Sequence, residues 1–248
     1  MTDQTATPAA PAAAGAADSL PARLIGVLFS PQATFQRIVA RPRWVAALAT
    51  VTLVTCALTF GMLSTERGQS AMLDQQVRQT EAFGQTVTEE QYTRMEQMLP
   101  VMRYIVTGSQ LVMIPVITLV VVGILYAVFN ALLGGSASFT QVAAVVAHSG
   151  AVTLVQQLFI APLNYVRESM SSATNLGVFV PFLDEGNIVA RFLGVIDLFI
   201  VWWLLVMAIG LGVLYRRRTA PIFWSFIGIY VIIALVVAVV MWSASGGA

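Results

Sequence analysis

The sequence predicts an all-α polytopic membrane protein, a helical bundle of about five transmembrane helices preceded by a short interfacial amphipathic helix. Three observations lead to this fold class. Hydrophobic residues make up 58% of the 248 residues and charged residues only 10%, whereas soluble domains contain about 25% charged residues. The mean hydropathy is +0.81. The apolar residues also gather into five runs, each long enough to cross a hydrocarbon layer of about 30 Å.

The first 19 residues are rich in Ala, Pro and Thr and contain almost no large apolar side chains. Such a segment cannot bury enough surface to offset the entropy lost on ordering, so residues 1–19 are predicted to form a disordered cytoplasmic tail. The first long apolar run begins only at Trp44, which is too late for a cleavable signal peptide. The first span is therefore expected to remain in the mature protein.

Residues 20–43 are predicted to form an amphipathic segment ahead of the first span. Ser30 and Pro31 match the cap and first position of a helix that Pro42 ends. Apolar side chains recur at helical spacing on one face of this helix, and arginines lie on another. Two interpretations stay open: the helix lies in the headgroup layer, or it packs on the membrane domain.

The membrane domain is expected to occupy residues 44–242, followed by a short tail at 243–248. Its five spans are predicted at residues 44–63, 104–133, 140–163, 192–215 and 221–242. Pro115 lies inside the second run and predicts a tilt, kink or break. The third run is predicted to end near Pro162.

Two connections contain further order. In the connection of residues 64–103, Thr88 and Gln91 fit a capping box, which predicts a helix over residues 88–102. In the connection of residues 164–191, the segment 175–183 is apolar but too short to span a bilayer. Both segments are expected to lie against the membrane surface or the bundle.

The orientation follows from arginine, because the chain contains no lysine. With the amino terminus in the cytoplasm and the carboxyl terminus outside, arginines crowd the inner ends of the spans. These residues are Arg23, Arg37, Arg41, Arg43, Arg216, Arg217 and Arg218. The net charge of +1 offers no field to attract nucleic acid, so nucleic-acid binding is not expected.

The residues that many enzymes need are missing. Without lysine there is neither a Schiff base nor a phosphate-binding loop with its lysine. One histidine and one cysteine cannot assemble the usual zinc sites. The sequence therefore predicts a protein that is not an enzyme and binds no cofactor or metal.

Asp197 stands inside the fourth apolar run, about 8 Å below its outer end at a rise of 1.5 Å per residue. Gln110, Gln156 and Gln157 fall about 9 to 11 Å below the outer ends of their own runs. An unpaired charge in hydrocarbon costs several kcal/mol or more, so these side chains are predicted to form a polar cluster inside the bundle. The cluster is either part of an ion or proton path or a set of structural interhelical hydrogen bonds.

His148 is expected at a second polar level, nearer the inner side, with Tyr126 and Tyr230. About 10 Å of depth separates this level from Asp197, which disfavours a direct contact. His148 and Ser149 are adjacent on one helix and point about 100° apart, so they cannot form a catalytic pair with each other. A hydrogen-bonded structural histidine is the favoured interpretation.

Three stretches together resemble the YIP family of membrane proteins, whose eukaryotic members interact with Rab GTPases. They are SPQATFQRIVARPRW, GGSASFTQVAAVVAHS and VIDLFIVWWLLVMAIGLGVLYRRR, and their order covers about residues 28 to 242. The resemblance implies a five-span domain with a cytoplasmic amino terminus. The GG turn and the helix with aspartate, phenylalanine and tryptophan look most similar to the prokaryotic branch.

The chain departs from the eukaryotic members of that family. It lacks their D-L-Y-G-P type and G-Y-x-x-x-P motifs, so the resemblance does not support binding to a Rab-type GTPase. The expected function is a non-enzymatic scaffold or interaction module in a bacterial inner membrane, with lipid and other membrane proteins or a second copy as partners. The alternative is a small transporter or channel component that uses the polar cluster around Asp197.

Overall fold

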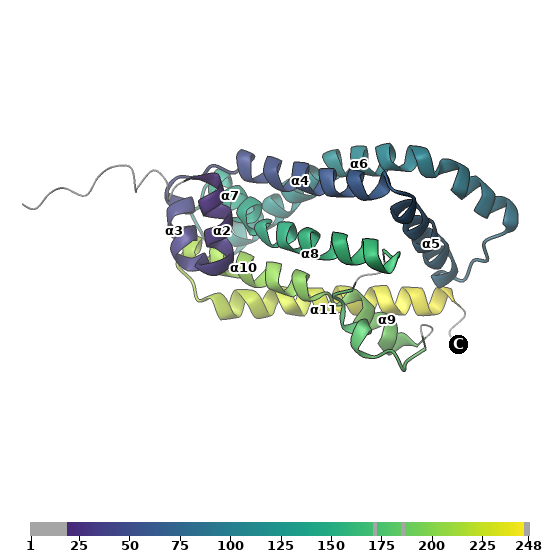
Figure 1. Cartoon of the computed structure of the whole chain (residues 1–248). Helices are drawn as coiled ribbons and strands as arrows, with labels where there is room; N and C mark the ends of the chain where they lie inside the picture. The colour runs from purple at the N-terminus through teal and green to yellow at the C-terminus, as the bar shows by residue number, and fades with distance from the viewer. Residues whose placement is uncertain (1–18, 171–172, 185–186, 246–248) are drawn as a thin grey trace, which may run out of the picture.

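The structure is a computed structural model that describes residues 19–170, 173–184 and 187–245. Every regular element within these residues is helical, and together they form one elongated bundle (Figure 1). The predicted all-α membrane bundle is confirmed. The predicted tail of residues 1–19 lies, apart from Ser19, outside the described residues, as does 246–248.

Five helical stretches of the described chain are long and apolar enough to cross a membrane, as predicted. The first is α4 (Val45–Leu63), and the last two are α10 (Leu198–Tyr215) and α11 (Thr219–Ala244). The second and third are each composite. They consist of α6 (Glu89–Tyr126) with the π-helical turn η1 (Ala127–Leu132), and of α7 (Phe139–Ser149) with α8 (Ala151–Arg167).

The predicted helix at residues 88–102 and the second span are one continuous helix, α6. The capping box is confirmed: the Gln91 N–H donates to Thr88 Oγ1 at 3.3 Å, and the Thr88 N–H donates to Gln91 Oε1 at 3.0 Å. Pro100 and Pro115 lie inside the helix, where each removes one backbone hydrogen bond without ending the helix. At 38 residues, α6 is about 57 Å long, so it extends well beyond a hydrocarbon core of about 30 Å.

The third span differs from the prediction at its carboxyl-terminal end, and the fourth at its amino-terminal end. Helix α8 does not end near Pro162 but continues to Arg167. The fourth span is not continuous over residues 192–215, because Ile196 and Asp197 have extended backbones between α9 (Ile188–Val195) and α10. An aspartate side chain competes for the N–H groups that follow it, and this favours a helix start at Leu198 over helix continuation.

The amphipathic segment forms a helical hairpin of α2 (Leu20–Phe29) and α3 (Pro31–Ala40), which contacts α7 and α10. Phe35 and Ile38 are completely buried there. Of the two interpretations that the sequence left open, the hairpin therefore packs on the bundle, while Ile25 and Phe29 remain exposed at its rim. Figure 1 shows the hairpin at the opposite end of the bundle from α5 (Glu66–Ala82).

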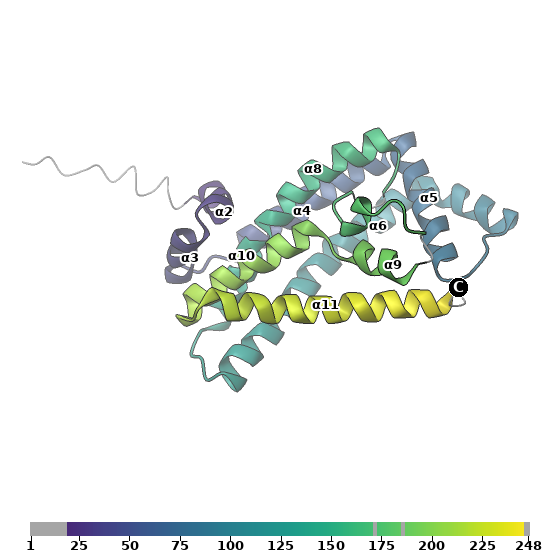
Figure 2. The same cartoon turned by 90° about the horizontal axis from the view of Figure 1, so that it is seen from below.

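Helices α7 and α10 form the centre of the packing. Half of the span in α7–α8 is buried inside the protein, against 11% in α6 and 17% in α11. A Cβ on Gly210 of α10 would lie 2.6 Å from Val145 Cγ1 of α7, so this glycine lets the two helices approach closely. Figure 2 shows α11 running along the length of the molecule, and many of its apolar side chains are exposed.

Candidate functional site

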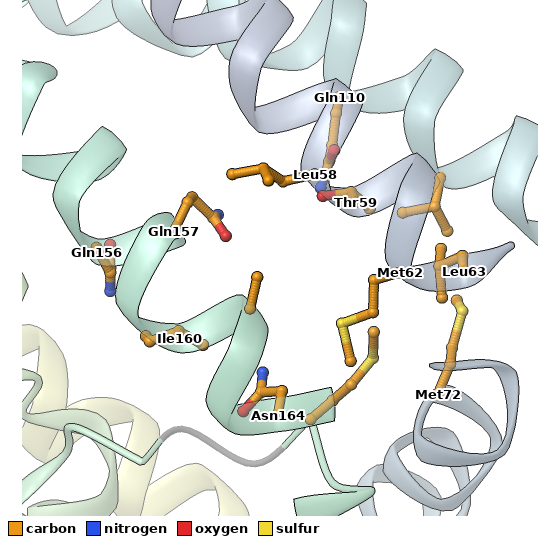
Figure 3. A pocket seen from close by; sticks show the side chains of 13 residues that line it. Leu58, Thr59, Met62, Leu63, Met72, Gln110, Gln156, Gln157, Ile160 and Asn164 are labelled. Carbon is orange, nitrogen blue, oxygen red and sulfur yellow. The ribbon is translucent and has the colours of Figure 1, made fainter. Parts of the chain in front are cut away.

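A cavity of about 330 Å³ lies between α4, α6 and α8, near the α5 end of the bundle. Side chains from all three helices border the same space (Figure 3). Four amides and a hydroxyl supply its polar surface: Thr59, Gln110, Gln156, Gln157 and Asn164. Apolar and thioether groups form much of the rest, among them Leu58, Ile160, Met62, Met72 and Met170.

The cavity amides are not used to hold the helices together. Among the described residues, no hydrogen bond involves the side chain of Gln110, Gln156 or Gln157. Gln110 Oε1 and Asn164 Oδ1 are buried and have no hydrogen-bond partner within the part of the chain that the structure describes. A buried oxygen without a hydrogen-bond donor costs about 1–3 kcal/mol, so these two atoms are unsatisfied polar groups on residues that line the cavity.

Asn164 is the residue of this site that sequence reasoning missed. It lies one residue beyond the predicted end of the third span, in the turn by which α8 exceeds that prediction. The only feature of the sequence that points to Asn164 is its position as a polar residue directly after an apolar run. The methionines at the α5 side of the cavity gave no signal, because methionine is commonly a gap-filling core residue.

Asp197 caps the amino terminus of α10. Its Oδ1 accepts the N–H groups of Phe199 at 2.7 Å and Ile200 at 3.4 Å, and Thr174 Oγ1 donates to its Oδ2 at 2.6 Å. The side chain is therefore placed where the helix dipole favours negative charge. An isolated antiparallel bridge between Asn175 and Asp197 fixes the connection beside it.

The structure brings the three glutamines to one cavity and leaves Asp197 outside it. Asp197 is not among the residues that line the cavity, and no hydrogen bond joins it to a glutamine. Tyr230 belongs with Asp197 instead, because its hydroxyl accepts the Asp197 N–H at 2.9 Å and donates to Val195 O at 2.8 Å. Counting depth along each span placed Asp197 with the glutamines and Tyr230 with His148, because such a count contains neither the break at Asp197 nor the packing of the helices.

His148 is fully buried in α7. Its Nδ1 bonds to Ala144 O at 2.8 Å, and Ser149 Oγ donates to Val145 O at 2.9 Å, so each side chain is engaged by its own helix. His148 Nε2 has no partner among the described residues. Tyr126 packs edge-on against Phe139, with ring centroids 6.0 Å apart. The second predicted polar level is therefore not a connected group.

The sequence model of the Yip1 domain matches residues 25–241, which is most of the chain. The protein belongs to the Yip1 domain family. No curated protein and no solved structure matches it. The family match agrees with the five long apolar helices, so this Yip1-family protein is a multi-pass membrane protein. In the described part of the chain, no three His, Cys, Asp or Glu side chains gather as metal ligands would.

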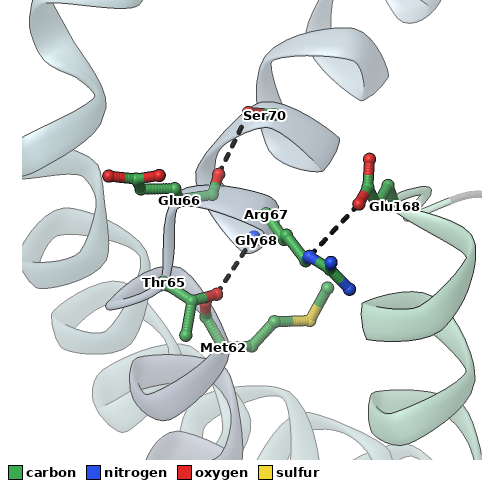
Figure 4. Close-up of polar contacts among 7 residues, drawn as sticks. All are labelled: Met62, Thr65, Glu66, Arg67, Gly68, Ser70 and Glu168. Carbon is green, nitrogen blue, oxygen red and sulfur yellow. Dashed lines mark hydrogen bonds and ion pairs between the residues drawn. The ribbon is translucent and has the colours of Figure 1, made fainter.

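In this Yip1-family protein, α5 contacts both α4 and α8 beside the cavity (Figure 4). Thr65 Oγ1 accepts the Gly68 N–H at 3.1 Å and so caps α5. A Cβ on Gly68 would lie 2.0 Å from Met62 O, so only glycine allows α5 to start this close to α4. Arg67 and Glu168 form an ion pair of 3.2 Å that ties α5 to the end of α8.

The arginines predicted to mark the inner side lie at the hairpin end of the bundle. Arg37, Arg41 and Arg43 lie on or just after α3, and Arg216, Arg217 and Arg218 connect α10 to α11. Arg23 differs from them, because it is only 2% exposed and donates from Nη1 to Arg41 O at 3.1 Å. Its role is structural: it holds the hairpin in its fold.

Proposed function

We propose that this Yip1-family protein is a non-enzymatic interaction module whose cavity between α4, α6 and α8 binds an uncharged hydrogen-bonding group. The observation that carries the proposal is the pair of buried amide oxygens without partners, Gln110 Oε1 and Asn164 Oδ1. A ligand hydroxyl or amide N–H supplies the missing donor. The remaining amides offer both donors and acceptors.

The chemistry of the lining favours a neutral group over an ion. None of the described lining residues is ionisable, and a charge in such a site lacks a compensating partner. A proton path through the cavity is not supported, since a path of this kind needs groups that titrate. Asp197, which the transporter hypothesis requires, serves instead as a helix cap.

The setting of the proposal is a bacterial inner membrane, with the amino terminus in the cytoplasm and the carboxyl terminus outside. The arginines at the hairpin end support this orientation, because positively charged residues accumulate on the cytoplasmic side. The GG turn at Gly134 and Gly135 supports the prokaryotic branch of the family. The exposed faces of α6 and α11 leave room for lipid, another membrane protein or a second copy.

Gln110→Leu tests whether the cavity serves binding or structural cohesion. The proposal predicts that the free energy of unfolding in detergent falls by less than about 1 kcal/mol or rises, because an unpaired buried amide is replaced by an apolar group of similar size. Thermal unfolding measures it, and Gln97→Leu on the exposed part of α6 is the control. A loss of several degrees in Tm relative to Gln97→Leu contradicts the proposal and makes Gln110 a structural residue.

A second experiment tests binding directly, with the variants Gln110→Leu, Gln97→Leu and Gln157→Leu. Protein purified from its native membrane is measured by native mass spectrometry for a co-purifying small molecule. We expect a bound mass on the wild-type protein and Gln97→Leu, and its loss from Gln110→Leu and Gln157→Leu. If all four proteins retain the small molecule equally, it binds elsewhere. This result contradicts the proposal that the cavity is its binding site.

A further inference from the structure

A second cavity, a groove of about 510 Å³, lies at the hairpin end of the bundle between α6–η1 and the first half of α11. Its walls are largely apolar, and Ile124 and Ile229 on its two sides are each 57% exposed. Arg217 and Arg218 line one end. Figure 2 shows the last turns before η1 passing α11 on this side. The groove therefore combines an open apolar wall with two cations.

The groove has the length of one membrane leaflet. On α11 it extends from Pro221 to Ile229, which is about 12 Å at 1.5 Å per residue. On the other side it extends from Ile124 to Leu133, a stretch of similar length that includes the π-helical turn η1. Half of a hydrocarbon core of about 30 Å is about 15 Å. An acyl chain that starts at the arginines thus runs along the groove to about the middle of the bilayer.

The charges at the groove end are not neutralised by nearby acids. Arg217 Nη2 donates to Leu133 O at 2.9 Å, which leaves its charge without a carboxylate partner. Arg218 is exposed and forms no ion pair with the described residues. Neither the turn of residues 133–139 nor residues 198–248 contain an acidic residue. The first N–H groups of α11 add positive potential, since no side chain caps them.

We propose that this groove binds an anionic phospholipid, with one acyl chain between α6–η1 and α11 and the phosphate at Arg217 and Arg218. The membrane supplies the ligand, and basic pockets between transmembrane helices suit anionic headgroups. A zwitterionic lipid fills the same apolar groove with an acyl chain, but it has no net negative charge to pair with Arg217 and Arg218. The inference is independent of the proposed function, because the two sites lie toward opposite ends of the bundle and share no lining residue.

The experiment measures lipid retention by the full-length protein in nanodiscs that contain equal amounts of phosphatidylglycerol and phosphatidylcholine. After partial delipidation, native mass spectrometry gives the ratio of the two lipids that stay bound. We expect phosphatidylglycerol to be preferred, and Arg218→Gln to reduce that preference about fivefold, the factor that one arginine near an anionic surface contributes. Arg218→Lys should restore most of it.

Two matched controls separate the groove from general attraction by the arginine run. Arg216→Gln removes the same charge at the residue next to Arg217 that does not line the groove, and it should leave the preference unchanged. Ile229→Trp fills the groove and should release both lipids, whereas Ile232→Trp, at an equally lipid-exposed position outside the lining, should release neither.

Three results overturn the proposal. The first is no preference for phosphatidylglycerol in the wild-type protein. The second is an equal loss from Arg216→Gln and Arg218→Gln, which indicates unspecific attraction by the arginine run. The third is displacement of the lipid by soluble glycerol phosphate, which indicates an anion site that does not use the groove.

Discussion

Asp197 illustrates how a charged residue is accommodated inside an apolar run. The sequence predicts correctly that this side chain needs partners, but the partners are backbone N–H groups and Thr174 and not the glutamines. A helix start satisfies a carboxylate by local contacts alone, without a second membrane helix. Sequence spacing could not reveal this, because the apolar run continues on both sides of the break and hides it.

Substitutions at Asp197 separate a capping role from a role for its charge. Asparagine is as good an N-cap as aspartate, so Asp197→Asn should change the free energy of unfolding by less than about 1 kcal/mol. Asp197→Ala removes the acceptor for Phe199 N–H and for Thr174, and should cost about 1–3 kcal/mol. Thermal unfolding in detergent distinguishes the two. Equal losses from both variants would mean that the negative charge, and not the cap, is what the fold requires.

At the scale of the elements, sequence reasoning found the spans but not all of their ends. Apolar length and composition decide whether a helix crosses the membrane, and these are visible in the sequence. The ends depend on tertiary contacts: α8 runs past Pro162, and α6 begins at Glu89, in the connection between the first two predicted spans. This is why Asn164, which is essential to the candidate cavity, lay outside the predicted span.

Helix α5 borders the cavity through Met72 and starts close to α4, and Gly68 makes this start possible. A methyl group at Gly68 would overlap Met62 O at 2.0 Å, so Gly68→Ala should displace the start of α5 and destabilise the protein by about 1–3 kcal/mol. Gly61→Ala is the matched control, because nothing lies within 4 Å of its Cβ position, and alanine favours the helix. Thermal unfolding checks both variants. If Gly68→Ala were as stable as Gly61→Ala, the close contact between α4 and α5 would not exist in solution.

The ion pair between Arg67 and Glu168 contributes little to the stability of the contact between α5 and α8. Arg67 and Glu168 have side chains that are 54% and 56% exposed, and exposed pairs of this kind contribute little to stability. The steric contact at Gly68 is therefore the main constraint on α5, and the ion pair fixes the neighbouring end of α8 at most weakly.

At the scale of the whole molecule, the two ends of the bundle differ in chemistry. The hairpin end carries seven of the thirteen arginines and the apolar groove, and the α5 end carries an uncharged cavity lined by amides. The sequence shows the first difference directly, as arginine positions. It shows the second only in part, because three glutamines at similar predicted depths do not reveal which helices bring them together.

The central claim is that the cavity between α4, α6 and α8 binds a polar group, which requires that a polar reagent can reach the Gln157 side chain. Cysteine labelling in intact cells tests it most directly, in a Cys56→Ala background with Gln157→Cys in the cavity and Phe159→Cys as the control. Phe159 is 55% exposed on the lipid-facing side of α8 and does not line the cavity. A membrane-impermeant maleimide added outside should label Gln157→Cys much faster than Phe159→Cys. Equal, slow labelling of both would contradict the claim, and labelling of Gln157→Cys only after permeabilisation would contradict the orientation.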